Sequence, residues 1–108
     1  MNDEVEVVGR QYYIHGGKEI NDVCNYLMDL MDLPFLDGSL KQNRQFAKHL
    51  INKSRKTFGD RWMEAIQVAI TNASQDAFWH KNLTSIRPVY KNFARFLKLG
   101  QGTTTLKI

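Results

Sequence analysis

The sequence predicts a small, mainly α-helical domain of four helices, preceded by a short N-terminal extended segment or β-hairpin. Three observations predict this class. From Ile20 onward, apolar residues recur at intervals of three and four, which is the spacing of one helix face. Near the N-terminus, apolar and polar side chains alternate instead, as they do along a strand. Prolines and glycines stand between these segments, where they typically end regular structure.

Residues 1–17 are expected to form an extended arm or a hairpin. Valine alternates with glutamate over residues 4–7, Gly9-Arg10 is predicted as the tight turn, and residues 11–14 are predicted as the return strand. An isolated two-stranded hairpin is only marginally stable in water. The segment is therefore expected either to pack against the helices or to remain a flexible arm.

The first two helices have clear boundary signals. The first is predicted over residues 18–32, because Pro34 stops a helix. The second is predicted over residues 40–58, with Ser39 as its N-cap and Gly59 just beyond its last residue. Each carries one apolar face, as expected of a helix that packs on a core.

The third helix is predicted to begin at Asp60, whose carboxylate would cap it, and to fade near Asn72. A turn or short helix is expected over residues 74–81. The last helix is predicted to start after a cap at Thr84 or Ser85.

Pro88 falls in the first turn of this last helix, where its missing N–H costs little, and Gly100 is expected to end it. The chain is thus divided into the N-terminal arm or hairpin, a helical domain over residues 18–100, and a flexible tail over residues 101–108.

Charge is strongly segregated along the chain. Residues 1–37 hold eight carboxylates and two cations, and residues 38–59 hold six cations and no carboxylate. Residues 60–108 hold seven cations and three carboxylates. The formal net charge of +4 therefore conceals an acidic first third and a basic remainder. Such a distribution indicates binding to a charged partner, most often a polyanion.

The cations also share helix faces. On a helical wheel, one group in the second helix lies within about 60° of arc: Lys41, Arg44, Lys48 and Arg55. A second group in the last helix lies within about 80° of arc: Arg87, Lys91, Arg95 and Lys98. Each group is opposite an apolar face.

A solvated outer face would explain these stripes, but such faces usually mix both signs of charge. Neither stripe contains a carboxylate, and like charges four residues apart destabilise a helix slightly. We therefore interpret the two stripes, together with Lys56, as contacts to a nucleic-acid backbone, with DNA preferred over RNA as the partner. If four to six cations engage phosphates, log K should fall with log salt at a slope of about −4 to −5.

Aromatic residues near the C-terminal end offer a further mode of binding. Phe78, Trp79 and Tyr90 could stack on unpaired bases. Their large apolar area favours core packing for Phe78 and Trp79. Tyr12 and Tyr13 are neighbours in a predicted strand, so they point to opposite faces and one of them should be exposed.

The first helix has an acidic face. It carries Asp22, Asp29 and Asp32, which we interpret together with Tyr12 as a docking face for a basic partner. A solvated face is the alternative. The three carboxylates are spread over almost three turns, so they are not expected to converge on a metal ion. An acidic end and a basic end on one molecule could also produce head-to-tail self-association into a homo-oligomer.

Sequence features of an enzyme are missing. His15, His49 and His80 lie far apart without metal-binding spacing, and the chain has neither a P-loop nor a G-x-S-x-G motif. Cys24 is the only cysteine, which suits a reducing cytoplasm, and it is expected to be a small core residue. The expectations are a non-enzymatic, cytoplasmic protein without cofactor or metal, secretory signal or membrane span.

Residues 78–97, FWHKNLTSIRPVYKNFARFL, combine an aromatic pair, polar residues, a Ser/Thr-capped turn and a closing helix. The stretch resembles the C-terminal region of phage and plasmid replication-initiation proteins, including the DnaD-like replisome organisers. Helices over residues 20–72 are similar in order and length. The resemblance implies a small helical module that binds DNA and contacts replication proteins such as a helicase or its loader.

Three functions are therefore considered. The first is a nucleic-acid-binding accessory protein of DNA replication or mobile-element biology. The second is a small phage-type interaction module or inhibitor that docks on a host or defence complex. The third is a helical subunit of a ribonucleoprotein. The first and third predict sensitivity to charge reversal on the basic stripes, whereas the second predicts sensitivity on the acidic helix or at the tyrosine pair.

Overall fold

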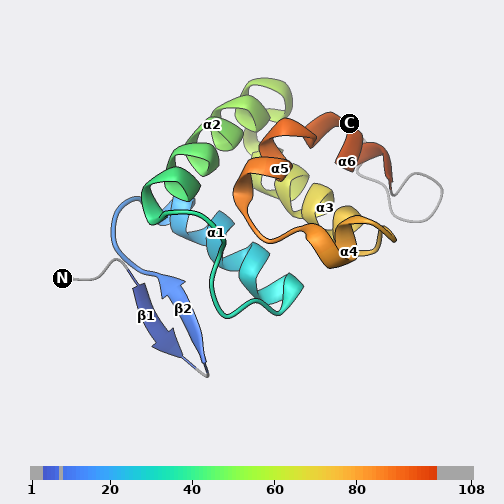
Figure 1. The fold of residues 1–108 in the computed structure, drawn as a ribbon. Helices are drawn as coiled ribbons and strands as arrows, with labels where there is room; N and C mark the ends of the chain where they lie inside the picture. The colour runs from blue at the N-terminus through green and yellow to red at the C-terminus, as the bar shows by residue number, and fades with distance from the viewer. Residues whose placement is uncertain (1–3, 8, 100–108) are drawn as a thin grey trace.

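The computed structural model describes residues 4–7 and 9–99 (Figure 1). In chain order its elements are β1 (Glu4–Val7), β2 (Arg10–Tyr13), α1 (Lys18–Met31), α2 (Leu40–Phe58), the 3₁₀ helix η1 (Gly59–Arg61), α3 (Trp62–Ser74), α4 (Trp79–Asn82), α5 (Ile86–Lys91) and α6 (Phe93–Leu99). A mainly α domain with an N-terminal hairpin is thereby confirmed. The predicted helix end at Gly100 and the predicted tail lie outside the described residues.

The hairpin is antiparallel, with Val7 opposite Arg10 and Val5 opposite Tyr12. Arg10 is therefore a strand residue, and the prediction of a turn at Gly9-Arg10 is wrong. Gly9 has a φ of +82°, a left-handed conformation that glycine adopts without a steric penalty. It consequently lies at the end of the turn instead of its beginning.

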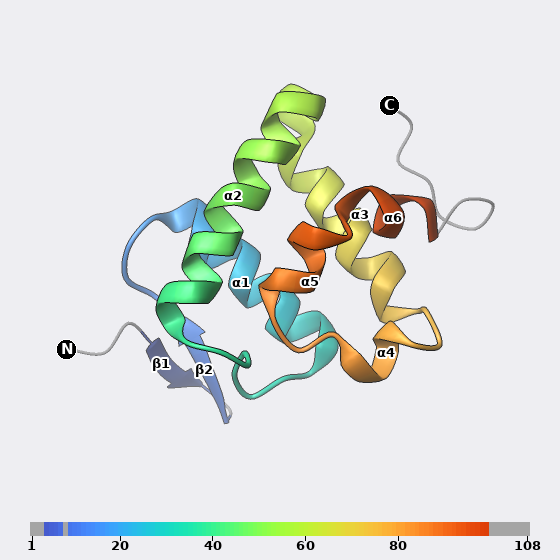
Figure 2. The same cartoon turned by 45° about the horizontal axis from the view of Figure 1, so that its top comes forward.

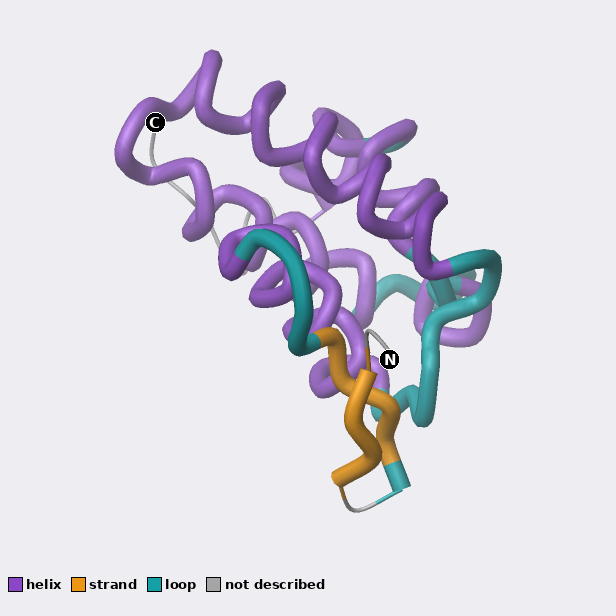
Figure 3. The backbone as a smooth tube through the Cα atoms, turned by 90° about the vertical axis from the view of Figure 1, so that its left-hand side faces the viewer, coloured by secondary structure: helices purple, strands orange, loops and turns teal. Residues whose placement is uncertain are grey.

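The hairpin packs on α1 at one end of the molecule (Figure 3). The Gln11 N–H donates to the Pro34 carbonyl at 2.8 Å. The side-chain amide of Asn25 binds Tyr13 twice: its Oδ1 accepts from the Tyr13 N–H at 2.8 Å, and its Nδ2 donates to the Tyr13 carbonyl at 2.9 Å. The outer edge of β2 is thus hydrogen-bonded by α1 and the loop that follows it, and the Tyr13 side chain is buried.

Helices α1 and α2 begin and end within one residue of their predicted positions. Asp32 adopts a left-handed conformation at the end of α1, and Pro34 follows. Helix α2 starts with a capping box: the Ser39 hydroxyl accepts from the Gln42 N–H at 3.0 Å, while the Gln42 side chain accepts from the Ser39 N–H. These local contacts explain why the sequence predicted the boundaries well.

Helix α3 lies at the centre of the fold, with α1, α2, α4 and α6 packed around it (Figures 1 and 2). Its alanines Ala65, Ala69 and Ala73 are fully buried, and their small side chains allow neighbouring helices to approach closely. The predicted cap at Asp60 is wrong. Because η1 leads directly from α2 into α3, the N-cap position falls on Arg61, which makes no side-chain capping bond.

The predicted last helix is broken into α5 and α6 at Asn92, which has non-helical dihedrals of −119° and 23°. The Asn92 side chain donates to the Pro88 carbonyl at 3.0 Å. The break turns α6 onto α3, where Phe93 and Phe96 are buried. Ser85 occupies the N-cap position of α5 but its side chain makes no capping bond.

The aromatic pair before α5 has two different environments. Trp79 packs on Phe96, with ring centroids 5.1 Å apart, in agreement with the expected core packing. Phe78 is 60% exposed, so the expectation of core packing is wrong for this residue. The chain turns sharply between α3 and α4, and this turn places Phe78 on the solvent side.

Candidate nucleic-acid interface

The outer face of α2 carries exposed cations and no acid, since the helix contains no aspartate or glutamate. We call the exposed lysines of α2 the α2 ridge, which extends from the α1 side of the helix to its α5 side: Lys41, Lys48, Lys53 and Lys56. Within the described ranges, no carboxylate lies within ion-pair distance of any of the four. Their positive charge therefore faces solvent without a neutralising partner.

Arg44 was predicted as a phosphate contact, but its side chain is directed into the fold. Its Nη2 donates to the backbone carbonyl of His15, and its guanidinium lies over the Tyr13 ring at 5.7 Å. A Cβ on Gly16 would overlap this guanidinium, so the chain passes closely over it. Arg44 thus anchors the segment that joins the hairpin to α1, and the prediction of a solvent-facing role is wrong.

Arg55 is also engaged within the molecule. Its Nη2 lies 2.6 Å from the Glu19 Oε2 of α1, and its guanidinium stacks over the Trp62 ring at 4.6 Å. Both charged side chains remain about half exposed, so the pair is a surface contact. Glu19 nevertheless neutralises the charge that Arg55 was expected to offer to a phosphate.

Helix α5 contributes two further exposed cations next to α2. Arg87 and Lys91 line an open groove of about 410 Å³ together with Gln42 and Phe46 of α2, and the exposed carboxylate of Asp37 lines it as well. No carboxylate in the described part of the chain forms an ion pair with either cation. These two predicted contacts therefore lie beside α2 on its α5 side, whereas Lys48 lines a different hollow with Glu19 and Ile20 of α1.

The contact between α2 and α5, which we call the aromatic seam, consists of Phe46, His49, Lys53 and Tyr90. None of these residues belongs to the cationic stripes that the helical wheel predicted. The Tyr90 ring lies 5.9 Å from Phe46 and 5.9 Å from His49, and the Lys53 Nζ lies 5.2 Å from its centroid. Phe46, His49 and Lys53 recur at intervals of three and four on α2, a signal that was available in the sequence. Their meeting with Tyr90 depends on the packing of α5 against α2.

Arg95 and Lys98 do not join this surface on a common helix. They lie on α6, beyond the break at Asn92, and line a separate hollow with Ala94 and Leu99. The prediction of one continuous cationic stripe over the last helix is therefore wrong, because the change of direction at the break separates α6 from α5.

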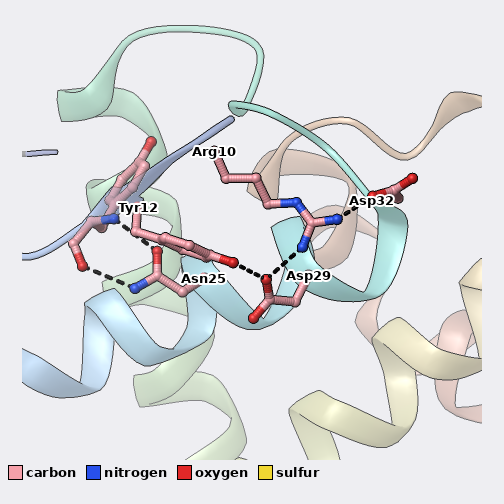
Figure 4. Close-up of polar contacts among 6 residues, drawn as sticks. Arg10, Tyr12, Asn25, Asp29 and Asp32 are labelled. Atoms are coloured by element: carbon pink, nitrogen blue, oxygen red, sulfur yellow. Dashed lines mark hydrogen bonds and ion pairs between the residues drawn. The ribbon is translucent and has the colours of Figure 1, made fainter. Parts of the chain in front are cut away.

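Three of the four predicted docking residues, Tyr12, Asp29 and Asp32, take part in contacts that hold the hairpin against the C-terminal end of α1 (Figure 4). Arg10 of β2 bridges Asp29, at 2.9 Å, and Asp32, while the Tyr12 hydroxyl donates to Asp29. Asp22 pairs with Lys18 at 2.9 Å, and this hydrogen bond raises the pKa of Lys18. All four residues thus have polar partners within the molecule, and a docking role for them stays a prediction.

The described residues offer no group of three or more His, Cys, Asp or Glu side chains placed to hold a metal ion. Within the same residues, no helix combines the length and apolarity that crossing a membrane requires. His80 lies on α4, with its Nδ1 3.1 Å from the Ser74 carbonyl.

The chain matches no protein-family model, no curated protein and no solved structure. The resemblance of residues 78–97 to replication-initiation proteins remains an expectation from the sequence. The molecule presents six exposed cations without acid partners on the neighbouring helices α2 and α5, and aromatic contacts between these two helices.

Proposed function

We propose that this protein is a non-enzymatic nucleic-acid-binding protein whose phosphate-binding surface is formed by the α2 ridge together with Arg87 and Lys91. One observation carries the proposal. These six exposed cations lie on two adjacent helices, and none of them has an ion-pair partner within the described chain. Five of the six belong to the set that the sequence predicted, and Lys53 is new.

Electrostatics favours a phosphate backbone as the partner. A surface whose charged groups are mainly positive attracts a polyanion at a distance. Each phosphate that it neutralises then releases condensed counterions. Uncompensated like charges also destabilise a helix slightly, and the sequence of α2 provides no acid to offset this cost. A binding partner that supplies the missing negative charge would offset it.

DNA is the proposed polymer, and an accessory role in DNA replication or mobile-element biology is the proposed setting. Both come from the resemblance of residues 78–97 to replication-initiation proteins. The cationic surface itself supports only the more general function, since phosphates carry no sequence information.

The test is a binding titration of fluorescent DNA and RNA at several salt concentrations. With six phosphate contacts, the expected slope of log K against log salt is about −4 to −5. Lys56→Glu should weaken binding and make the slope shallower. Lys81→Glu, which changes the net charge equally but lies on α4, should leave both nearly unchanged.

Two results would contradict the proposal. One is the absence of binding to every nucleic acid at low salt, which would favour the protein-docking alternative. The other is an equal effect of Lys56→Glu and Lys81→Glu, which would indicate a general dependence on net charge and no defined surface.

A further inference from the structure

We propose that the groove between α2 and α5 accepts an unpaired base, so that the ligand of this protein is single-stranded nucleic acid. The inference rests on the proposed function and adds the class of substrate. It is carried by the side chains that line the groove and by the aromatic seam beside it.

The groove has both an apolar wall and free polar groups. Phe46 is half-buried and lines it, and the half-buried Tyr90 packs against Phe46 at an angle of 42°. The amide nitrogen of Gln42 has no hydrogen-bond partner among the residues described, although its Oε1 belongs to the capping box of α2. An aromatic face and an unused amide are the groups that receive the face and the edge of a base.

The size of the groove agrees with this ligand. Its volume of about 410 Å³ falls within the range of small-molecule sites. Gly38 forms part of its wall, and a Cβ at this position would lie 3.3 Å from the Gln42 Oε1. The absence of a side chain at Gly38 therefore leaves space beside the Gln42 amide. The groove is open to solvent along the surface, as a polymer ligand requires.

Cations flank the groove where the neighbouring phosphates would lie. Arg87 and Lys91 lie on the α5 side, and the Lys53 ammonium lies over the Tyr90 ring. The groove also contains one carboxylate, that of Asp37, so the two cations outnumber the acid. Aromatic side chains between cations are typical of surfaces that bind single strands, because successive bases stack while the backbone follows the charges. A duplex keeps its base faces stacked on each other and would engage only the cations.

The experiment compares three labelled ligands at one salt concentration: an oligothymidylate of about 20 nucleotides, an abasic strand of the same length, and a duplex of the same length. The abasic strand has the phosphates without the bases. Oligothymidylate should bind at least about five-fold more tightly than the abasic strand, since one stacked base contributes at least that factor.

Phe46→Leu should reduce the ratio of the affinity for oligothymidylate to the affinity for the abasic strand towards one, because leucine preserves the apolar volume without an aromatic face. Phe78→Leu is the matched control, since Phe78 is the more exposed phenylalanine and does not line the groove. The ratio in this variant should equal that of the wild type. A loss of the ratio in Phe78→Leu alone would overturn the assignment of the groove.

A crosslinking measurement on the wild type is independent of whether Phe46→Leu folds. A strand that contains 5-iodouracil should crosslink on irradiation to Phe46 or Tyr90, as located by mass spectrometry of peptides. Crosslinks confined to Phe78 or Trp79 would overturn the inference.

The two proposals fail in different ways. Equal affinity for oligothymidylate, abasic strand and duplex would overturn the groove assignment and leave phosphate binding in place. Failure of all three ligands to bind at low salt would overturn both.

Discussion

The Asn43 side chain of α2 accepts a hydrogen bond from the backbone N–H of Ile86, at 3.1 Å, and so fixes the start of α5 against α2. The same amide donates to the carbonyls of Asp37 and Ser39, at 2.9 Å and 3.1 Å. Asn43 is buried, and its hydrogen bonds join two segments that are 43 positions apart. This contact positions the α5 side of the groove relative to the α2 ridge.

Asn43→Ala should therefore destabilise the protein by about 2–3 kcal/mol, because it removes three hydrogen bonds and leaves the buried Ile86 N–H without its acceptor. Urea unfolding followed by circular dichroism measures the change in the free energy of unfolding. Gln42→Ala is the neighbouring control and should cost less than about 1 kcal/mol, since it removes only a long, exposed capping contact. Similar costs for the two variants would show that the Asn43 network is not important for stability.

Arg55 and Lys56 are sequence neighbours that should differ in nucleic-acid binding. Arg55 is paired with Glu19, whereas Lys56 has no acidic partner in the described structure. Lys56→Ala should make the slope of log K against log salt shallower by about one. Arg55→Ala should leave the slope nearly unchanged. The reverse result would mean that Arg55 exchanges Glu19 for a phosphate on binding.

Arg44→Met should loosen the segment between the hairpin and α1. The change removes the hydrogen bond to the His15 carbonyl and the contact with the Tyr13 ring, and a hydrogen bond from a charged group contributes about 1.5–3 kcal/mol. Amide hydrogen exchange should become faster in residues 13–17. Lys41→Met, an exposed substitution on the same helix, is the control and should leave exchange there unchanged. Unchanged exchange in Arg44→Met would contradict the anchoring role.

Cys24 should be unreactive in the folded protein. Burial raises the pKa of its thiol to about 12, against the opposing effect of nearby Arg44, so almost no thiolate is present at pH 8. A thiol reagent such as dithiobis-nitrobenzoate should modify it only when urea unfolds the chain. Rapid reaction without urea would show that the interior around Cys24 opens readily.

The same pKa shift predicts a loss of stability at alkaline pH. The unfolded chain releases the thiol proton near pH 9, while the folded protein keeps it until about pH 12. Between these values the unfolded state binds fewer protons, so the free energy of unfolding falls by up to about 1.4 kcal/mol per pH unit. Comparison with Cys24→Ala separates this effect from other titrating groups, and parallel pH profiles of the two proteins would refute it.

Local signals in the sequence predicted the helices well. The ends of α1 and α2 depend on groups within a few residues, such as Pro34 and the Ser39–Gln42 capping box. The prediction of a cap at Asp60 was wrong because η1 continues directly into α3. The break at Asn92 was not predicted because the apolar spacing continues through it. Burial of α6 against α3 outweighed the preference for one continuous helix.

The candidate site was only partly predictable. Composition showed that α2 has cations and no acids, and the structure leaves Lys41, Lys48 and Lys56 in solvent, as expected. A helical wheel describes one helix and cannot show what packs beside it. It therefore could not reveal that Arg44 and Arg55 are engaged by the hairpin segment and α1.

The sequence by itself determined which segments are helical and where positive charge is concentrated, because helix capping, proline geometry and residue charge act locally or need no fold. Only the tertiary structure decided which cations remain available. The pairing of Arg55 with Glu19 spans 36 positions, and the contact of Lys53 with Tyr90 depends on the packing of α5 on α2. Such contacts form only once distant segments are brought together by burial of the shared core.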